Sequence, residues 1–169
     1  MNNIAYTCSN ILKSTKTVAQ KEQLALEIDQ LIASLFRQET NAFDNALKSI
    51  RLEVSQIIID EFLNKESQSV NKEMVKYFLT ELKKRLQKLR IIKLSLAFSP
   101  SNYSIDRIYD WIAKNVGDEY ILDIQVDKSI LGGITISFEG KYIDLSLKKR
   151  LDEVFKNKRQ EIISSLSKT

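Results

Sequence analysis

Two carboxylates, Asp123 and Asp127, come closest to the spacing of an acid–base pair. They lie in a segment whose apolar residues alternate, so it is predicted to be a strand that presents both on one face. Four residues at strand rise separate them by about 13 Å, too far for a shared proton or metal ion. We interpret them as solvated charges. Asp144 and Ser146 are better interpreted as an acid and an N-cap at the start of a helix than as a catalytic pair.

The usual catalytic and metal-binding side chains are scarce. Histidine is absent and Cys8 is the only cysteine, which leaves Asp, Glu, Lys, Tyr and Ser for chemistry. An active site can still be built from these side chains, so an enzyme stays open as the less favoured interpretation, and the sequence assigns no catalytic residue, no cofactor and no metal site. A single cysteine also excludes an internal disulfide, which fits a reducing compartment.

The glycine pair Gly132–Gly133 is the strongest backbone signal, because it lies within a chain of 169 residues that has only four glycines. A phosphate-binding loop would need a following Gly-Lys-Ser/Thr or a G-x-G-x-x-G pattern, and neither is present. The pair instead indicates a bulge or a close approach of two backbones. We therefore expect Gly133→Leu to destabilise the C-terminal domain.

The net charge is +4, and one basic cluster carries no intervening acid. Exposed aromatic side chains, which single-strand nucleic-acid binding favours, do not alternate with these bases. A solvated face is the main interpretation, and contact with an acidic partner or a lipid headgroup is the alternative. An RNA-binding α/β module also stays open, and would bind RNA in a salt-sensitive way. The cluster comprises Lys83, Lys84, Arg85, Lys88, Arg90 and Lys93.

Residues 1–88 are predicted to form a helical domain, because no glycine or proline occurs before Pro100. Three apolar stripes follow helical spacing, with a soft break at 38–41, where Thr40 or Asn41 is a possible cap, and a clearer one at 64–71. The spacing alone leaves two packed helices and one long rod as alternatives over 18–63. The stripes are Leu24, Ile28, Leu31 and Leu35; Phe43, Leu47, Ile50, Val54, Ile57, Ile58 and Phe62; and Met74, Phe78, Leu82, Leu86 and Leu89.

Residues 89–169 are predicted to form a small α/β domain with a three- to four-stranded sheet, so the fold class is α+β. Alternating residues predict strands at 92–98, 120–126 and 134–138, and the helix from about Ser104 to Val116 makes the first two parallel. Glu139–Gly140 predicts a hairpin turn. The terminal helix carries one apolar stripe: Leu147, Leu151, Val154, Phe155, Ile162 and Leu166. Phe155 and Ile162 are candidate interface residues, and so is Trp111, for which covering the sheet edge is an equal alternative.

The order of motifs in this second part resembles the C-terminal signature of the F-type ATP synthase delta subunit (OSCP) family. The matching pieces are Ile130-Leu131-Gly132-Gly133, the alternating strand, the glycine turn, Ile143-Asp144-Leu145-Ser146, and a helix that opens with Leu147, Arg150 and Leu151. The helical part departs from the family: it looks shorter than a six-helix bundle and lacks a Tyr-Ala-x-Ala-Leu opening.

The resemblance implies a connecting subunit of the peripheral stalk, active in ATP synthesis and proton transport, which tethers the catalytic head and resists rotation. Its implied partners are the alpha subunits for the helical part and the b subunits for the C-terminal domain; nucleic acid is not expected. Gly132, Gly133, Asp144, Ser146, Arg150 and Leu151 are then expected to shape the C-terminal domain. No apolar run reaches the ~18 to 20 residues of a membrane span.

Such a subunit would be membrane-associated through its complex, at the cytoplasmic face of the inner or plasma membrane, with an organellar equivalent as the lesser alternative. Met1–Lys21 contains no arginine and no apolar core, so a cleaved targeting segment is not expected. Two related alternatives are the stalk E subunit of V-type or archaeal-type ATPases and a b–delta fusion. A single rod from Leu24 to Phe62 would favour both.

Overall fold

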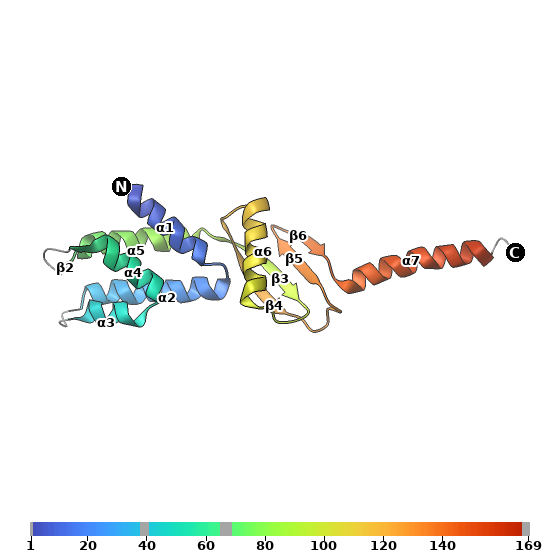
Figure 1. The fold of residues 1–169 in the computed structure, drawn as a ribbon, viewed down its shortest axis with the longest axis horizontal. Coiled ribbons are helices and arrows are strands. Elements are labelled where there is room, and N and C mark those ends of the chain that lie inside the picture. The colour runs from blue at the N-terminus through green and yellow to red at the C-terminus, as the bar shows by residue number, and fades with distance from the viewer. Residues whose placement is uncertain (1, 38–40, 65–68, 167–169) are drawn as a thin grey trace. The chain divides into compact units, whose positions relative to one another are not determined.

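The computed structural model describes residues 2–37, 41–64 and 69–166. The chain divides into two compact units, Met1–Arg90 and Ile91–Thr169 (Figure 1). The first unit is helical, and the second combines helices with a four-stranded mixed sheet. The predicted fold class, a helical part followed by a small α/β part, is confirmed.

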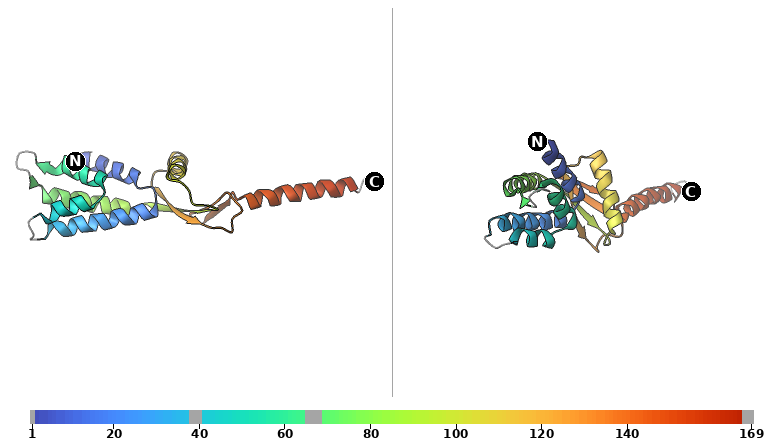
Figure 2. Two further views of the ribbon diagram at one scale, coloured as in Figure 1. Left: turned by 60° about the horizontal axis from the view of Figure 1, so that its bottom comes forward. Right: turned by 60° about the vertical axis from the view of Figure 1, so that its left-hand side comes forward.

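The described part of the first unit contains five helices and a two-stranded antiparallel ribbon. Helix α2 packs against both α3 and α5, while α5 also contacts α1 and α4 (Figures 1 and 2). The elements are α1 (Asn2–Ser14), α2 (Val18–Leu35), α3 (Ala42–Ser49), α4 (Leu52–Phe62), β1 (Leu63–Asn64), β2 (Ser69–Val70) and α5 (Lys72–Gln87).

Helix α2 shows how the sequence specifies this bundle. Thr17 caps it: the Thr17 hydroxyl accepts from the Gln20 N–H at 3.3 Å, and the Gln20 side chain accepts from the Thr17 N–H at 3.1 Å. The predicted stripe is buried, with Leu24, Ile28 and Leu31 at 0% exposure. Each fully buried leucine or isoleucine contributes roughly 1.5–3 kcal/mol. Burial of this stripe therefore fixes α2 against its neighbours.

The single rod over 18–63 is wrong. Helix α2 ends at Leu35, α3 begins at Ala42, and these two helices pack together. The second predicted stripe also belongs to two helices, because Ile50 leaves helical geometry with ψ 174° before α4 begins. Both helices bury their apolar residues in one core, so the periodicity runs on across the break. Asn41 precedes α3 with φ 77° but makes no side-chain cap, and Thr40 lies outside the described residues.

Two parts of the bundle were placed wrongly or missed from the sequence. Met74 is 46% exposed, and Val75 takes the buried position, because the Asn71 cap starts α5 with Val75 facing the core. Helix α1, whose composition is mostly polar, still buries Cys8 and Ile11 in the bundle. Burial raises the pKa of the Cys8 thiol, which favours a protonated packing group.

The second unit is built on a sheet of strand order β4-β3-β5-β6. Strand β5 runs antiparallel to β3 and to β6, so the parallel pair of this mixed sheet is β3 and β4. Their carboxyl ends coincide: the N–H of Asp127 donates to the carbonyl of Leu96 at 2.8 Å. The elements are β3 (Arg90–Leu96), α6 (Asn102–Asn115), β4 (Tyr120–Val126), β5 (Ile134–Phe138), β6 (Lys141–Asp144) and α7 (Leu147–Leu166).

Helix α6 lies on one face of this sheet (Figure 2) and shares an apolar core with Ile92, Leu94 and Leu122. Its N-cap is Ser101, whose hydroxyl accepts from the Ser104 N–H at 3.2 Å. The helix was predicted to begin at about Ser104, so it begins earlier than predicted. Phe98, which was predicted to continue the first strand, lies beyond its end and is 63% exposed.

Candidate interaction site

The glycine pair holds the junction between β6 and α7. Gly132 and Gly133 adopt φ of 89° and 88°, a region that side chains disfavour. A Cβ on Gly133 would lie 2.5 Å from the Leu145 carbonyl oxygen and 2.9 Å from the Ser146 Cα. The Gly132 carbonyl in turn accepts from the Leu147 N–H at 2.9 Å. The glycine pair therefore lies where two backbone segments approach closely, and one of its carbonyls is hydrogen-bonded to the first residue of α7.

Asp144 and Ser146 complete this junction. The Asp144 carboxylate accepts from the Ser146 N–H at 2.8 Å, and the Ser146 hydroxyl accepts from the Lys149 N–H at 3.3 Å. Hydrogen bonds from the Ser146 hydroxyl and N–H lower the pKa of Asp144. Ser146 is 5% exposed. The two residues act as a helix cap and its support, and their contacts fix the direction in which α7 begins.

Helix α7 presents an uncovered apolar surface. Every side chain that the structure describes on this helix is exposed, including Leu151 at 39% and Phe155 at 66%. The side chain of Ile162 lies outside the described residues. Arg150 is also exposed on this helix. A helix with exposed leucine, valine and phenylalanine is typical of a protein contact surface.

Trp111 borders a second apolar surface. Its side chain is 60% exposed and lines a groove of about 300 Å³ between α6 and the sheet. Arg107 is the charged residue among those that line the groove, and the rest are apolar. The lining residues are Leu94, Arg107, Ile108, Trp111, Ile112, Ile134, Ile136 and Leu145. The sequence indicated Trp111 as an interface candidate but not the groove, because the groove depends on how α6 sits on the sheet.

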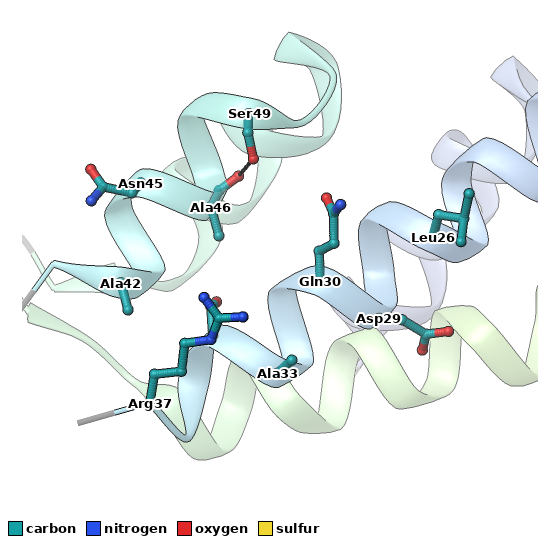
Figure 3. A pocket seen from close by; sticks show the side chains of 10 residues that line it. Leu26, Asp29, Gln30, Ala33, Arg37, Ala42, Asn45, Ala46 and Ser49 are labelled. Atoms are coloured by element: carbon teal, nitrogen blue, oxygen red, sulfur yellow. Dashed lines mark hydrogen bonds between the residues drawn. The ribbon is translucent and has the colours of Figure 1, made fainter. Parts of the chain in front are cut away.

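A second hollow, between α2 and α3 in the first unit, was missed from the sequence. Figure 3 shows Ala33 of α2 with Ala42 and Ala46 of α3 among polar side chains that include Arg37. The hollow has a volume of about 570 Å³. Asp29, at its edge, forms an ion pair with Lys83 of α5. Its only sequence signal is small residues at spacings of three and four on α3.

The basic cluster carries fewer unpaired charges than its sequence suggests. Lys83 pairs with Asp29, and Lys84 pairs with Glu81 at 2.9 Å.

Within the described residues, no group of three or more Asp, Glu or Cys side chains is arranged to hold a metal ion. None of the described helices is both long and apolar enough to cross a membrane.

Five described helices around one core, followed by a mixed sheet that carries α6 on one face, define a two-unit helical and α/β protein. A family model described as ATP synthase delta (OSCP) subunit matches residues 2–157. The chain belongs to the ATP synthase delta (OSCP) subunit family. The resemblance drawn from Gly132–Gly133 and from Ile143 to Ser146 is thus confirmed, and it extends through the helical part.

Individual relatives agree with this assignment. An ATP synthase subunit delta of Thermosipho africanus (strain TCF52B) is 25% identical over 142 residues, which cover 82% of this chain and 69% of that protein. One from Ureaplasma urealyticum serovar 10 is 32% identical over 100 residues, 59% of this chain and 55% of that protein. Among solved structures, a chain of the Polytomella F-ATP synthase aligns with a TM-score of 0.38 and 22% identity, covering 46% of this chain and 99% of that one.

Proposed function

We propose that this protein is the non-catalytic connecting subunit of the peripheral stalk of an F-type ATP synthase. In this role it tethers the catalytic head to the stalk and stops the head from turning with the central shaft. The observation that carries the proposal is the uncovered apolar side of α7, in a chain that belongs to the delta family. An exposed amphipathic helix of this kind is suited to helix-to-helix contact with another subunit.

The two units bind different partners. The helical unit, Met1–Arg90, binds the N-terminal ends of the alpha subunits, and the unit Ile91–Thr169 binds the ends of the stalk b subunits. We propose these as two domains, close to the predicted 1–88 and 89–169. The protein lies at the membrane face that carries the head, the cytoplasmic face in a bacterium, and is held there by its partners.

Resistance to torque requires a stiff connection between the sheet and α7. Gly133, Asp144 and Ser146 provide it, because their backbone approach and hydrogen bonds fix the first turn of the helix. A joint of this kind transmits a sideways load to the sheet rather than bending. The glycine pair, the Asp144–Ser146 cap and the surface of α7 with Arg150 and Leu151 thus have one mechanical purpose.

Affinity capture of the full chain tests this proposal. A tagged chain is expressed with the alpha and b subunits of the same organism, and both are expected in the captured material. Phe155→Ser should reduce recovery of b and leave alpha recovery unchanged, because Phe155 is exposed on α7. Tyr142→Ala is the control, since Tyr142 is also an exposed aromatic residue but lies on β6. Recovery of neither subunit, or of V-type head subunits instead, would overturn the proposal.

A further inference from the structure

The positive charge of the second unit is concentrated on helix α7. Residues 91–146 carry five lysines and arginines against eight acids, a net charge of −3, whereas α7 carries six against three, a net charge of +3. Opposite charges favour a helix that folds back onto the rest of its unit. Every side chain that the structure describes on α7 is nevertheless exposed. The basic side chains of this helix therefore face solvent.

The same helix carries an apolar stripe that is also exposed. Leu147, Leu151, Val154 and Phe155 follow helical spacing, so they lie on one side of α7. All four are exposed, and Phe155 is the most exposed of them at 66%. A surface helix of a globular protein normally buries such a stripe. Helix α7 is thus an amphipathic helix whose apolar side and basic residues are both open to a ligand.

Basic side chains border the stripe on both of its edges. Lys148 lies seven residues before Phe155 and Arg159 four residues after it, so both border one edge. Arg150 lies four residues before Val154 and borders the other edge. A ligand that contacts the stripe would therefore meet positive charge on either side of it.

Lys158 lies within the stripe, because it follows Leu151 by seven residues. A tightly packed contact between two protein helices would bury its ammonium group, which is costly without an acidic partner. At a bilayer surface its aliphatic stem can lie along the acyl chains while the ammonium group reaches the headgroups. A lysine at this position therefore favours a lipid surface as the ligand.

The acids of α7 lie mostly away from the stripe. Glu153 lies on the opposite side of the helix, and Asp152 is further from the stripe than Arg159. Glu161 is the acid whose position borders the stripe. Four basic residues against one acid therefore lie in or beside the apolar side, which complements an anionic surface.

We propose that α7 of the free, unassembled chain binds the surface of an anionic lipid bilayer. The helix lies in the interfacial plane, with its stripe at the boundary of the acyl chains and its basic side chains on lipid phosphates. Each lysine or arginine near such a surface strengthens binding about fivefold. RNA would use the same charges but not the stripe, so the exposed Phe155 favours the bilayer.

Lipid binding of the free chain goes beyond the proposed function and does not depend on it. One consequence does rest on that function, in which α7 contacts a b subunit. The bilayer and b then occupy the same side of α7, so a b subunit should displace the chain from the membrane surface. The bilayer would collect free chains where the rest of the complex resides.

Vesicle binding of the full chain tests the proposal. The probe is a vesicle of equal parts phosphatidylcholine and phosphatidylglycerol, and a vesicle of phosphatidylcholine alone is the control. Phe155→Trp in a Trp111→Phe background places the only indole of the chain on α7. Its emission should shift to shorter wavelength on the anionic vesicles alone. Phe155→Ser should weaken binding about tenfold, and Phe155→Leu, which stays apolar, less than about threefold.

Charge reversal tests the electrostatic part. Lys148→Glu with Arg159→Glu should weaken binding to the anionic vesicles at least about 25-fold, and the loss should shrink as salt is added. Lys114→Glu with Lys141→Glu is the matched control: the net charge changes equally, and both residues are exposed in the same unit, on α6 and β6. Its affinity should stay within about threefold of wild type. Because all four side chains are exposed, both variants should unfold near the wild-type midpoint.

The outcomes that contradict the proposal are separable from a failure of the stalk function. Equal binding to both kinds of vesicle, or no emission shift on vesicles that hold the chain, would overturn it. Equal losses for the two charge-reversal pairs would show that net charge, and not α7, drives binding. RNA bound as tightly, with no loss for Phe155→Ser, would show that the ligand is nucleic acid. Binding of the b segment without vesicle binding would refute the lipid site and leave the stalk function standing. Vesicle binding that the b segment does not reverse would refute the shared surface.

Discussion

Replacement of Gly133 by alanine perturbs the β6–α7 junction with a single methyl group. The added Cβ would lie 2.5 Å from the Leu145 carbonyl oxygen, closer than real Cβ contacts allow, and the backbone has φ +88°. The left-handed conformation costs roughly 1–2 kcal/mol for a residue with a side chain. Displacing the opposing backbone adds an overpacking cost of about 1–3 kcal/mol. We therefore expect Gly133→Ala to lower the free energy of unfolding by about 3 kcal/mol, and Gly133→Leu to lower it by more.

Thermal unfolding followed by Trp111 fluorescence measures this loss, because Trp111 lies in the second unit. For a unit of this size, about 3 kcal/mol lowers the unfolding midpoint by roughly 12 to 24 °C. Gly140→Ala is the matched control: its φ of +74° is also positive, but nothing lies within 4 Å of the added Cβ. Gly140→Ala should therefore lower the free energy of unfolding only by the cost of a side chain at positive φ, about 1–2 kcal/mol. Equal losses for the two variants would refute the close approach at Gly133.

Three further predictions follow from the same geometry. Because the pKa of Asp144 is lowered, this carboxylate stabilises the folded protein fully above the ordinary value of 3.8, and the stabilisation is lost as pH falls through the folded-state pKa. Asp144→Asn should therefore flatten the acid dependence of helical circular dichroism. An unchanged acid profile would contradict the role of Asp144. Glu27→Gln should lower the free energy of unfolding by about 2 kcal/mol, because it removes the charge from the 3.0 Å hydrogen-bonded pair of the Glu27 carboxylate with Arg51. Urea unfolding measures this loss, and an unchanged urea midpoint would show the pair to be neutral. Phe155→Ser should leave the thermal midpoint within about 2 °C of wild type, because the ring is 66% exposed; a large loss would mean that α7 packs within the free chain.

Much of the fold was predictable because it follows local rules. The stripe Leu24 to Leu35 has helical spacing, and Ile134, Ile136 and Phe138 alternate as a strand must. The Glu139–Gly140 turn was also predicted, and both residues have positive φ, as a two-residue hairpin requires. The family resemblance depended on Gly132–Gly133, whose backbone conformation few other residues can adopt.

The features that failed depend on tertiary packing. The break at Ile50 leaves no gap in the apolar period, because α3 and α4 both face one core. Helix α1 buries only a few residues, so its polar composition hid its place in the bundle. The Trp111 groove depends on where α6 lies across the sheet, and no spacing within α6 reveals that position.

The central claim is that one chain joins the head to the stalk through two different units. The most direct test mixes the purified full chain with an N-terminal segment of alpha and a C-terminal segment of b, and measures the mass of the resulting complex by light scattering. A ternary complex is predicted, with Phe155→Ser lowering affinity for the b segment alone. Competition between the two segments for one site, or no binding of either, would contradict the claim.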